Sequence, residues 1–331
     1  MTRTMTAVRA VAPVVSDLRS VTAMLAPVRG VPQLAEPVLP WTETTVVDLG
    51  DRGRLTVHHT PGLHDTDRPP VVVLHGVTLT ADLNFFALAD VVGGRRPAIV
   101  FDLPNHGSGI RVRRFAFTDV ADDIVAVLDH LGVPAAVLCG YSLGGITAMV
   151  TADRHPSRVA GIVVQAAAMR YAVDVRERVF LQGVSTVHRL GLDQATRSLP
   201  ARYWRIAARR SPHAAARWEW ISRQMTVSGR PRLATVFAAV GRTDHRHLRP
   251  TCPTVVTLLR SDRVCPPRLQ REAADLLGAH VVEADADHDL PVADPARYAD
   301  LTARALDHVD AQIAARDERR DGPGSAGGVT L

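Results

Sequence analysis

Short apolar runs alternate with segments of helical periodicity along most of the chain. Nearly continuous apolar runs, such as 71–74, are typical of strands buried on both faces, as in a parallel sheet, whereas the first two runs flank a hairpin loop at 50–53. Expected strands lie at 44–49, 54–59, 71–74, 97–101, 135–139, 159–164, 254–259 and 280–283. Expected helices lie at 81–92, 118–131 with Thr118 as N-cap, 143–155, 267–277 and 295–315. This alternation predicts repeated βαβ units in a doubly wound, mostly parallel sheet of the α/β class.

Two segments depart from this rhythm. Residues 5–28 carry apolar side chains at helical spacing, and prolines follow them as far as Pro40, so residues 1–41 are expected to form an amphipathic helix and a linker. We expect the helix to dock on the main body; a membrane-surface anchor or a flap over the site is the alternative. Residues 169–249 lack buried strands and concentrate aromatic and arginine side chains, which predicts a helical cap.

The remaining segments complete the domain organisation. The main domain is expected to comprise residues 42–168 and 250–315, because the sheet pattern returns after the cap. We expect the aromatic residues of the cap to form a small core of their own. Residues 316–331 are charged and then rich in glycine, which predicts a disordered tail.

Composition narrows the classes of function. The 331 residues contain no lysine, and the 39 arginines give a net charge of +5 without a basic run interleaved with aromatics, so nucleic-acid binding is not expected. Three scattered cysteines favour neither a disulfide framework nor a metal site. No apolar stretch approaches the about 18 residues of a membrane span, and the N-terminus is a poor signal peptide. A cytoplasmic protein is therefore expected, with membrane association through residues 5–28 as the alternative.

The stretch Gly140-Tyr141-Ser142-Leu143-Gly144 joins an expected strand to an expected helix. A serine on such a sharp turn has strained backbone geometry, and its neighbours must be small because the strand and helix are crowded there. The turn would expose the Ser142 hydroxyl at the carboxyl edge of the sheet, where sites of doubly wound folds lie. This arrangement predicts a nucleophile.

A serine nucleophile needs a base and a group that orients the base. His288 and Asp262 both follow later expected strands at the same edge, in the chain order serine, acid, histidine. Asp285, Asp287 and Asp289 crowd the histidine and are rivals for the acid; we favour Asp262, because the sequence neighbours of His288 cannot easily face its ring. Their charges are expected to raise the pKa of His288.

These motifs together resemble the α/β-hydrolase superfamily over residues 42–315. The matching pieces are Leu74-His75-Gly76, Asp102 to Gly109, Gly140 to Gly145, Ser261 to Pro266 and Asp287-His288. The chain departs from the family pattern at Pro104-Asn105 and at Asp287, where glycine is common.

The resemblance implies a role for each matching residue. Ser142 would be the nucleophile, His288 the general base and then acid, and Asp262 the orienting carboxylate. The backbone N–H groups of Val77 and Leu143 would form the oxyanion hole. His75, Gly76, Gly140 and Gly144 would support the site structurally, and no cofactor or metal is implied.

The expected function is hydrolysis of a small-molecule carboxylic ester with a hydrophobic acyl chain, through an acyl-enzyme on Ser142. Acyl transfer, thioester hydrolysis and carbon–carbon bond hydrolysis use the same triad and stay open. A ligand-binding member of the fold with little turnover is the alternative from another class. The sequence carries no signal for an oligomeric state.

Overall fold

The computed structural model describes residues 31–92, 96–171, 211–227 and 233–321, together with a few single positions between 173 and 186. The helix expected over residues 5–28, most of the first half of the cap, and residues 322–331 lie outside the described residues.

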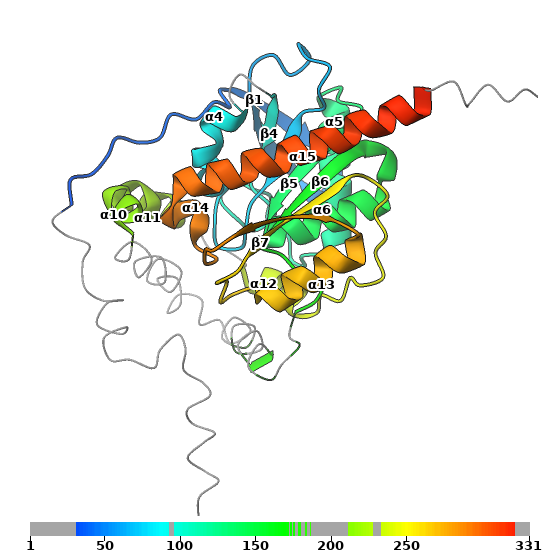
Figure 1. The fold of residues 1–331 in the computed structure, drawn as a ribbon. Helices are drawn as coiled ribbons and strands as arrows, with labels where there is room; N and C mark the ends of the chain where they lie inside the picture. The colour runs from blue at the N-terminus through cyan, green and yellow to red at the C-terminus, as the bar shows by residue number, and fades with distance from the viewer. Residues whose placement is uncertain are drawn as a thin grey trace, which may run out of the picture.

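One sheet of eight strands organises the molecule (Figure 1), in the order β1-β2-β4-β3-β5-β6-β7-β8. The strands are β1 (Glu43–Asp48), β2 (Arg54–His59), β3 (Val71–Leu74), β4 (Ala98–Val100), β5 (Ala136–Tyr141), β6 (Val159–Gln165), β7 (Thr254–Leu259) and β8 (His280–Ala284). β1 pairs antiparallel with β2, and β2 pairs antiparallel with β4. All other pairs are parallel. The prediction of a mostly parallel α/β sheet is confirmed.

Helices cover both faces of this sheet. Helices α5 (Phe117–His130), α6 (Leu143–Arg154) and α13 (Pro267–Leu277) share one apolar cluster with alternate strand residues such as Val72 and Leu138. The neighbouring positions Val73 and Cys139 point to the other face, which the long helix α15 (Pro295–Asp321) crosses (Figure 1). This alternation follows from the two-residue period of a strand and explains why the central strands β3 and β5 are buried at every position.

Several helix boundaries differ from those expected. The segment 81–92 divides into α3 (Ala81–Phe85), a 3₁₀ turn over Phe86–Leu88, and α4 (Ala89–Val92). The tighter turn lets two successive rings join different apolar clusters, Phe85 beneath α15 and Phe86 beneath the cap.

Two helix ends also correct the sequence analysis. Helix α5 starts at Phe117 with Ala116 as its N-cap, so Thr118 lies inside the helix. The buried side chain of Phe117 holds this earlier start. Helix α15 continues to Asp321, so residues 316–321 are helical and the predicted tail is wrong there. This last part has arginine and glutamate among its residues, which are good helix formers.

The described part of the cap packs directly on the main domain. It comprises α10 (Pro212–Ala216), α11 (Trp218–Val227) and α12 (Leu233–Gly241). Trp220 contacts Phe86 edge to face, with the ring centroids 5.1 Å apart, and shares a cluster with Leu79 and Val292. Trp220 therefore belongs to an interface with the main domain and not to a separate core of the cap.

The two ends of this cap segment reach different parts of the main domain. Helix α10 contacts α14 (Leu290–Ala293), as Figure 1 shows, while α12 joins the cluster of α5 and α6 through Val236 and Ala239. Within the described residues, no helix combines the length and the apolar character needed to cross a membrane.

Candidate active site

Ser142 lies on the tight turn between β5 and α6. Its backbone has φ +52° and ψ −109°, a strained conformation for a residue with a side chain. A Cβ on Gly140 would come 2.1 Å from the carbonyl oxygen of Gly144, and one on Gly144 would come 1.8 Å from that of Leu74. Both positions therefore require glycine, because the strands and the helix approach one another too closely for any side chain.

The three residues expected to form a triad lie within hydrogen-bonding distance, with His288 between Ser142 and Asp262. His288 Nε2 is 3.2 Å from Ser142 Oγ, and His288 Nδ1 is 2.8 Å from Asp262 Oδ2. Since the Asp262 carboxylate accepts a hydrogen bond from the Nδ1–H of His288, the neutral ring presents an unprotonated Nε2 to the serine hydroxyl. Ser142 donates to a base in this arrangement, and the base is oriented by a carboxylate.

Asp262 is fixed from several directions. Its side chain is fully buried, and Oδ1 accepts the backbone N–H groups of Val264 (2.8 Å) and Cys265 (2.7 Å). Oδ2 also accepts an N–H from Gln270 of α13 at 3.0 Å. These donors compensate the burial of the charge and hold the oxygen that faces His288.

The rival carboxylates bind elsewhere. Asp287 pairs with the Arg263 guanidinium and also accepts the backbone N–H of His288 at 2.8 Å, so its oxygens do not face the ring. Asp285 accepts the hydroxyl of Ser261 at 2.7 Å. Asp289 precedes α14 as its N-cap residue, although its side chain makes no capping hydrogen bond.

The environment of His288 changes its basicity. Burial of the ring lowers its pKa, but the charge and hydrogen bond of Asp262, with the charges of Asp287 and Asp289, outweigh the burial. The pKa of His288 is therefore raised above its ordinary value, so the ring is a stronger base than a free histidine.

The expected oxyanion donors follow neighbouring strands. Leu74 pairs with Gly140, so the turn containing Val77 and the start of α6 at Leu143 leave the sheet at the same edge.

The Val77 turn is anchored because Asn84 Oδ1 accepts the N–H of Gly76 at 2.8 Å. Asn84 in turn donates to the Tyr298 hydroxyl of α15. Through Asn84, the turn is therefore connected by hydrogen bonds to the buried Tyr298 of α15.

His75 and its neighbours brace the loops around the site. Fully buried His75 accepts the N–H of Leu103 at Nε2 (2.9 Å) and bonds the carbonyl of Gly76 through Nδ1 (2.8 Å). Burial lowers its pKa, which keeps the ring neutral and suits both bonds. Asp102 accepts N–H groups of Ala81 and Ser108 and so links two of these loops.

Three contributors were missed by the sequence analysis. Gln270 lies on the buried face of α13 together with Ala273 and Ala274. A polar residue at such an apolar position could have indicated that its side chain bonds a group near the site. Asn84 is likewise a polar residue in an apolar segment. The Tyr141 hydroxyl donates to the carbonyl of His288 at 2.9 Å and supports the histidine loop; its place inside the serine motif concealed that role.

No group of three or more His, Cys, Asp or Glu side chains in the described residues is arranged to hold a metal ion. Cys139 is buried in the sheet, which raises the pKa of its thiol to about 12. The thiol of Cys265 lies against the Tyr171 hydroxyl. Both cysteines are thus placed as packing residues.

Known proteins of similar sequence include esterases. A pimeloyl-[acyl-carrier protein] methyl ester esterase from Chromobacterium violaceum is 29% identical over 217 residues, covering 63% of this chain and 82% of the relative. An enzyme of the same name from Neisseria meningitidis is 29% identical over 180 residues, covering 52% of this chain and 67% of the relative.

Solved structures show the same fold at lower identity. A hydrolase from Pseudomonas aeruginosa has a TM-score of 0.66 at 19% identity, covering 80% of this chain and 98% of that structure. An esterase from Exiguobacterium antarcticum also has a TM-score of 0.66, at 17% identity, covering 80% and 100%. The model of the α/β-hydrolase fold family matches residues 69–295, well over half of the chain. With its sheet order and its serine turn, the protein belongs to the α/β-hydrolase family.

Proposed function

We propose that this protein is a serine hydrolase that cleaves carboxylic esters through an acyl-enzyme on Ser142. The observation that carries the proposal is the line from Asp262 through His288 to Ser142, with the serine on a strained turn at the start of α6. His288 contacts the Ser142 hydroxyl as a base, and the buried Asp262 carboxylate holds His288 in the required tautomer. These two contacts make the hydroxyl a nucleophile.

Acylation begins with proton transfer from Ser142 Oγ to His288 Nε2 as the oxygen attacks the ester carbonyl carbon. The resulting oxyanion accepts hydrogen bonds from the N–H groups of Val77 and Leu143, at the N-terminus of α6. When the tetrahedral intermediate collapses, the carbon–oxygen bond to the alcohol breaks and His288 protonates the departing alkoxide. Asp262 stabilises the imidazolium between these two steps.

Deacylation repeats the sequence with water. His288 accepts a proton from a water molecule as its oxygen attacks the acyl carbon, and then returns that proton to Ser142 Oγ as the carboxylic acid leaves. The raised pKa of His288 favours both of its proton-accepting steps.

A small ester with an apolar acyl chain is the substrate class we favour. Leu79, close after the Val77 turn, and Val292, close after His288, belong to one apolar cluster with Trp220 of the cap. Apolar side chains therefore border both loops that would surround the reacting carbonyl. The names of the related enzymes support ester cleavage, since two of them are methyl ester esterases.

The test is turnover of p-nitrophenyl esters from acetate to decanoate by the wild type and by Ser142→Ala. We expect kcat/KM to rise with chain length, and Ser142→Ala to lose at least about 10³-fold. Ser222→Ala is the matched control, because that hydroxyl donates to a backbone carbonyl within α11 and takes no part in the triad. Equal turnover by Ser142→Ala would contradict the mechanism, and a preference for acetate would contradict the apolar acyl chain.

A further inference from the structure

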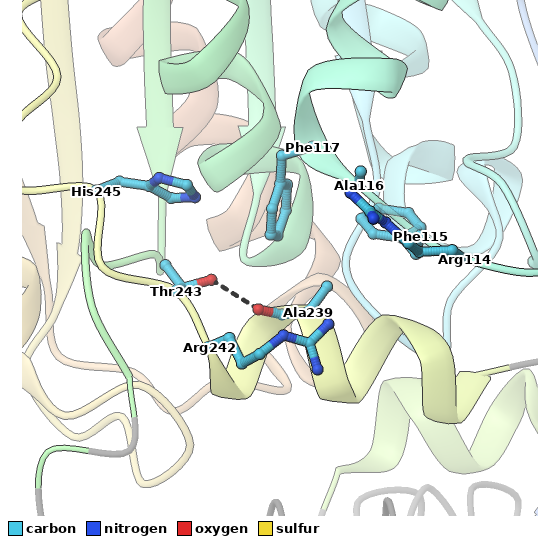
Figure 2. Close-up of a pocket in the computed structure, with 8 residues that line it drawn as sticks. All are labelled: Arg114, Phe115, Ala116, Phe117, Ala239, Arg242, Thr243 and His245. Atoms are coloured by element: carbon cyan, nitrogen blue, oxygen red, sulfur yellow. Dashed lines mark hydrogen bonds between the residues drawn. The ribbon is translucent and has the colours of Figure 1, made fainter.

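A cavity of about 500 Å³ opens between the start of α5 and the end of α12 (Figure 2). Residues 114–117 form one side of it, and Ala239, Arg242, Thr243 and His245 form the other. We name it the Arg114–Arg242 pocket. None of Ser142, Asp262 and His288 is among its lining residues, so it is separate from the triad. Its volume falls in the range of sites for small organic molecules, about 300–1,000 Å³.

One part of the lining is apolar and aromatic. Phe115 and Phe117 meet edge to face with ring centroids 5.3 Å apart, and Phe117 meets the His245 ring edge to face at 5.5 Å. Ala239 of α12 lies across from them (Figure 2). These side chains are mostly buried and form a wall suited to the apolar body of a ligand.

The other part of the lining is cationic. The guanidinium groups of Arg114 and Arg242 come from different segments, and within the described ranges neither forms an ion pair or a side-chain hydrogen bond. The neighbouring carboxylates are already engaged: Asp119 pairs with Arg52, and Asp244 pairs with Arg246. The two positive charges beside the cavity are therefore not neutralised by the acidic residues closest to them in sequence.

His245 adds an unused polar group. Its Nε2 is buried and has no hydrogen-bond partner in the part of the chain that the structure describes. Burial, with the nearby His247, lowers the pKa of the ring, so His245 is neutral near pH 7 and retains one N–H to donate. A buried polar atom without a partner is costly, and within the described residues the protein leaves such a group unsatisfied beside this pocket.

We propose that the Arg114–Arg242 pocket is a second ligand site, which binds an organic carboxylate with an apolar body. The carboxylate pairs with the guanidinium groups, while the hydrocarbon or aromatic body packs against Phe115 and Phe117. Because Ser142 does not line the pocket, the ligand would bind whether or not Ser142 is a nucleophile.

The first test is calorimetric titration with decanoate, and with decanol as the uncharged analogue, on the wild type, Arg114→Gln and Arg242→Gln. We expect decanoate to bind more tightly than decanol, and each substitution to weaken decanoate binding about two- to fivefold. Arg113→Gln is the matched control, because Arg113 is an exposed neighbour outside the lining. Equal affinity of all four proteins for decanoate would overturn the proposal.

The second test locates the bound molecule, since decanoate is also a candidate product at Ser142. A decanoate analogue with a terminal diazirine is photolysed on the protein, and the modified peptides are identified by mass spectrometry. We expect adducts within residues 114–117 or 239–245 that disappear with excess decanoate. Adducts confined to peptides containing Ser142 or His288 would overturn the second site without affecting the proposed esterase activity. Thermal unfolding of each variant verifies that it is folded.

Discussion

Two sets of polar side chains at the carboxyl edge of the sheet are held in opposite ways. Around the triad, Asp262 receives four hydrogen-bond donors, and His288 is bonded at both ring nitrogens. Around the Arg114–Arg242 pocket, the guanidinium groups and the His245 Nε2 lack protein partners in the described residues. At the triad, protein groups complete the hydrogen bonds, whereas at the Arg114–Arg242 pocket a ligand would have to complete them.

The difference is informative because an unsatisfied buried group costs free energy, whereas a satisfied one is held in a single orientation. A network that is complete without substrate suits chemistry, since its groups need no rearrangement when the reaction occurs. A set of groups left incomplete by the protein suits binding, since the ligand provides the missing partners. Variants of the triad should therefore change ester turnover, whereas variants of the pocket should change ligand binding and stability.

The largest effect is expected from the triad itself. His288→Gln and Asp262→Asn should lower kcat for ester hydrolysis by about 10⁴-fold, because the serine loses its base or the base loses its tautomer. Steady-state kinetics on a p-nitrophenyl ester measures this. Asp287→Asn is the matched control: it removes the neighbouring carboxylate that binds Arg263 and should keep kcat within about threefold at alkaline pH. Similar losses in Asp287→Asn and Asp262→Asn would refute the assignment of the acid.

The pH profile should follow His288. The ring accepts a proton only when neutral, so kcat/KM should fall about tenfold per pH unit below the pKa of His288. Because Asp262 and its neighbours raise that pKa, the midpoint should lie above about 6.5. Asp287→Asn removes one of the charges that raise it and should move the midpoint to lower pH. An unchanged midpoint in Asp287→Asn would show that another group controls the profile.

A smaller effect is expected from the oxyanion turn. In Asn84→Leu the N–H of Gly76 loses its acceptor, so the Val77 turn is less well positioned. We expect kcat to fall about tenfold with KM nearly unchanged, and stability to fall by about 1–3 kcal/mol. Asn84→Asp keeps an oxygen facing Gly76 and should retain more of kcat. A variant whose KM rises while kcat is kept would show that Asn84 serves binding instead.

The smallest effect is expected at the pocket. In the absence of ligand, His245→Phe removes the unpartnered Nε2 and keeps a ring against Phe117, so the free energy of unfolding should rise by about 1 kcal/mol. Chemical denaturation measures this, with the exposed His247→Phe as control. Ester turnover should stay within about twofold of wild type. A loss of stability in His245→Phe would show that the ring is already satisfied and would weaken the contrast between the two regions.

The strands and the serine turn at the carboxyl edge of the sheet could be predicted, because short sequence patterns determine them. The apolar runs locate β3 and β7 directly, since strands buried on both faces need continuous apolar residues. Gly140 and Gly144 mark the serine turn because the backbones approach too closely for a side chain there. Ser142, Asp262 and His288 each follow a strand at the same edge, so the serine motif, the strand ends and the chain order together predicted that they meet.

The rest depends on contacts between distant segments. Gln270 reaches Asp262, and Asn84 reaches both Gly76 and Tyr298, through side-chain bonds that no short motif encodes. Trp220 lies among the aromatic residues from which a separate cap core was expected, but it packs on Phe86 of the main domain. Sequence alone does not determine which apolar surfaces pack against each other. The Arg114–Arg242 pocket joins segments more than a hundred residues apart, so periodicity carries no signal for it.

The central claim is that Ser142 is an activated nucleophile. The most direct measurement is reaction with a fluorophosphonate probe, followed by peptide mass spectrometry. We expect one adduct, on Ser142, that is absent in Ser142→Ala and forms far more slowly in His288→Gln. Ser222→Ala should be labelled like the wild type. No adduct on folded wild-type protein, or equal labelling of Ser142→Ala, would contradict the account.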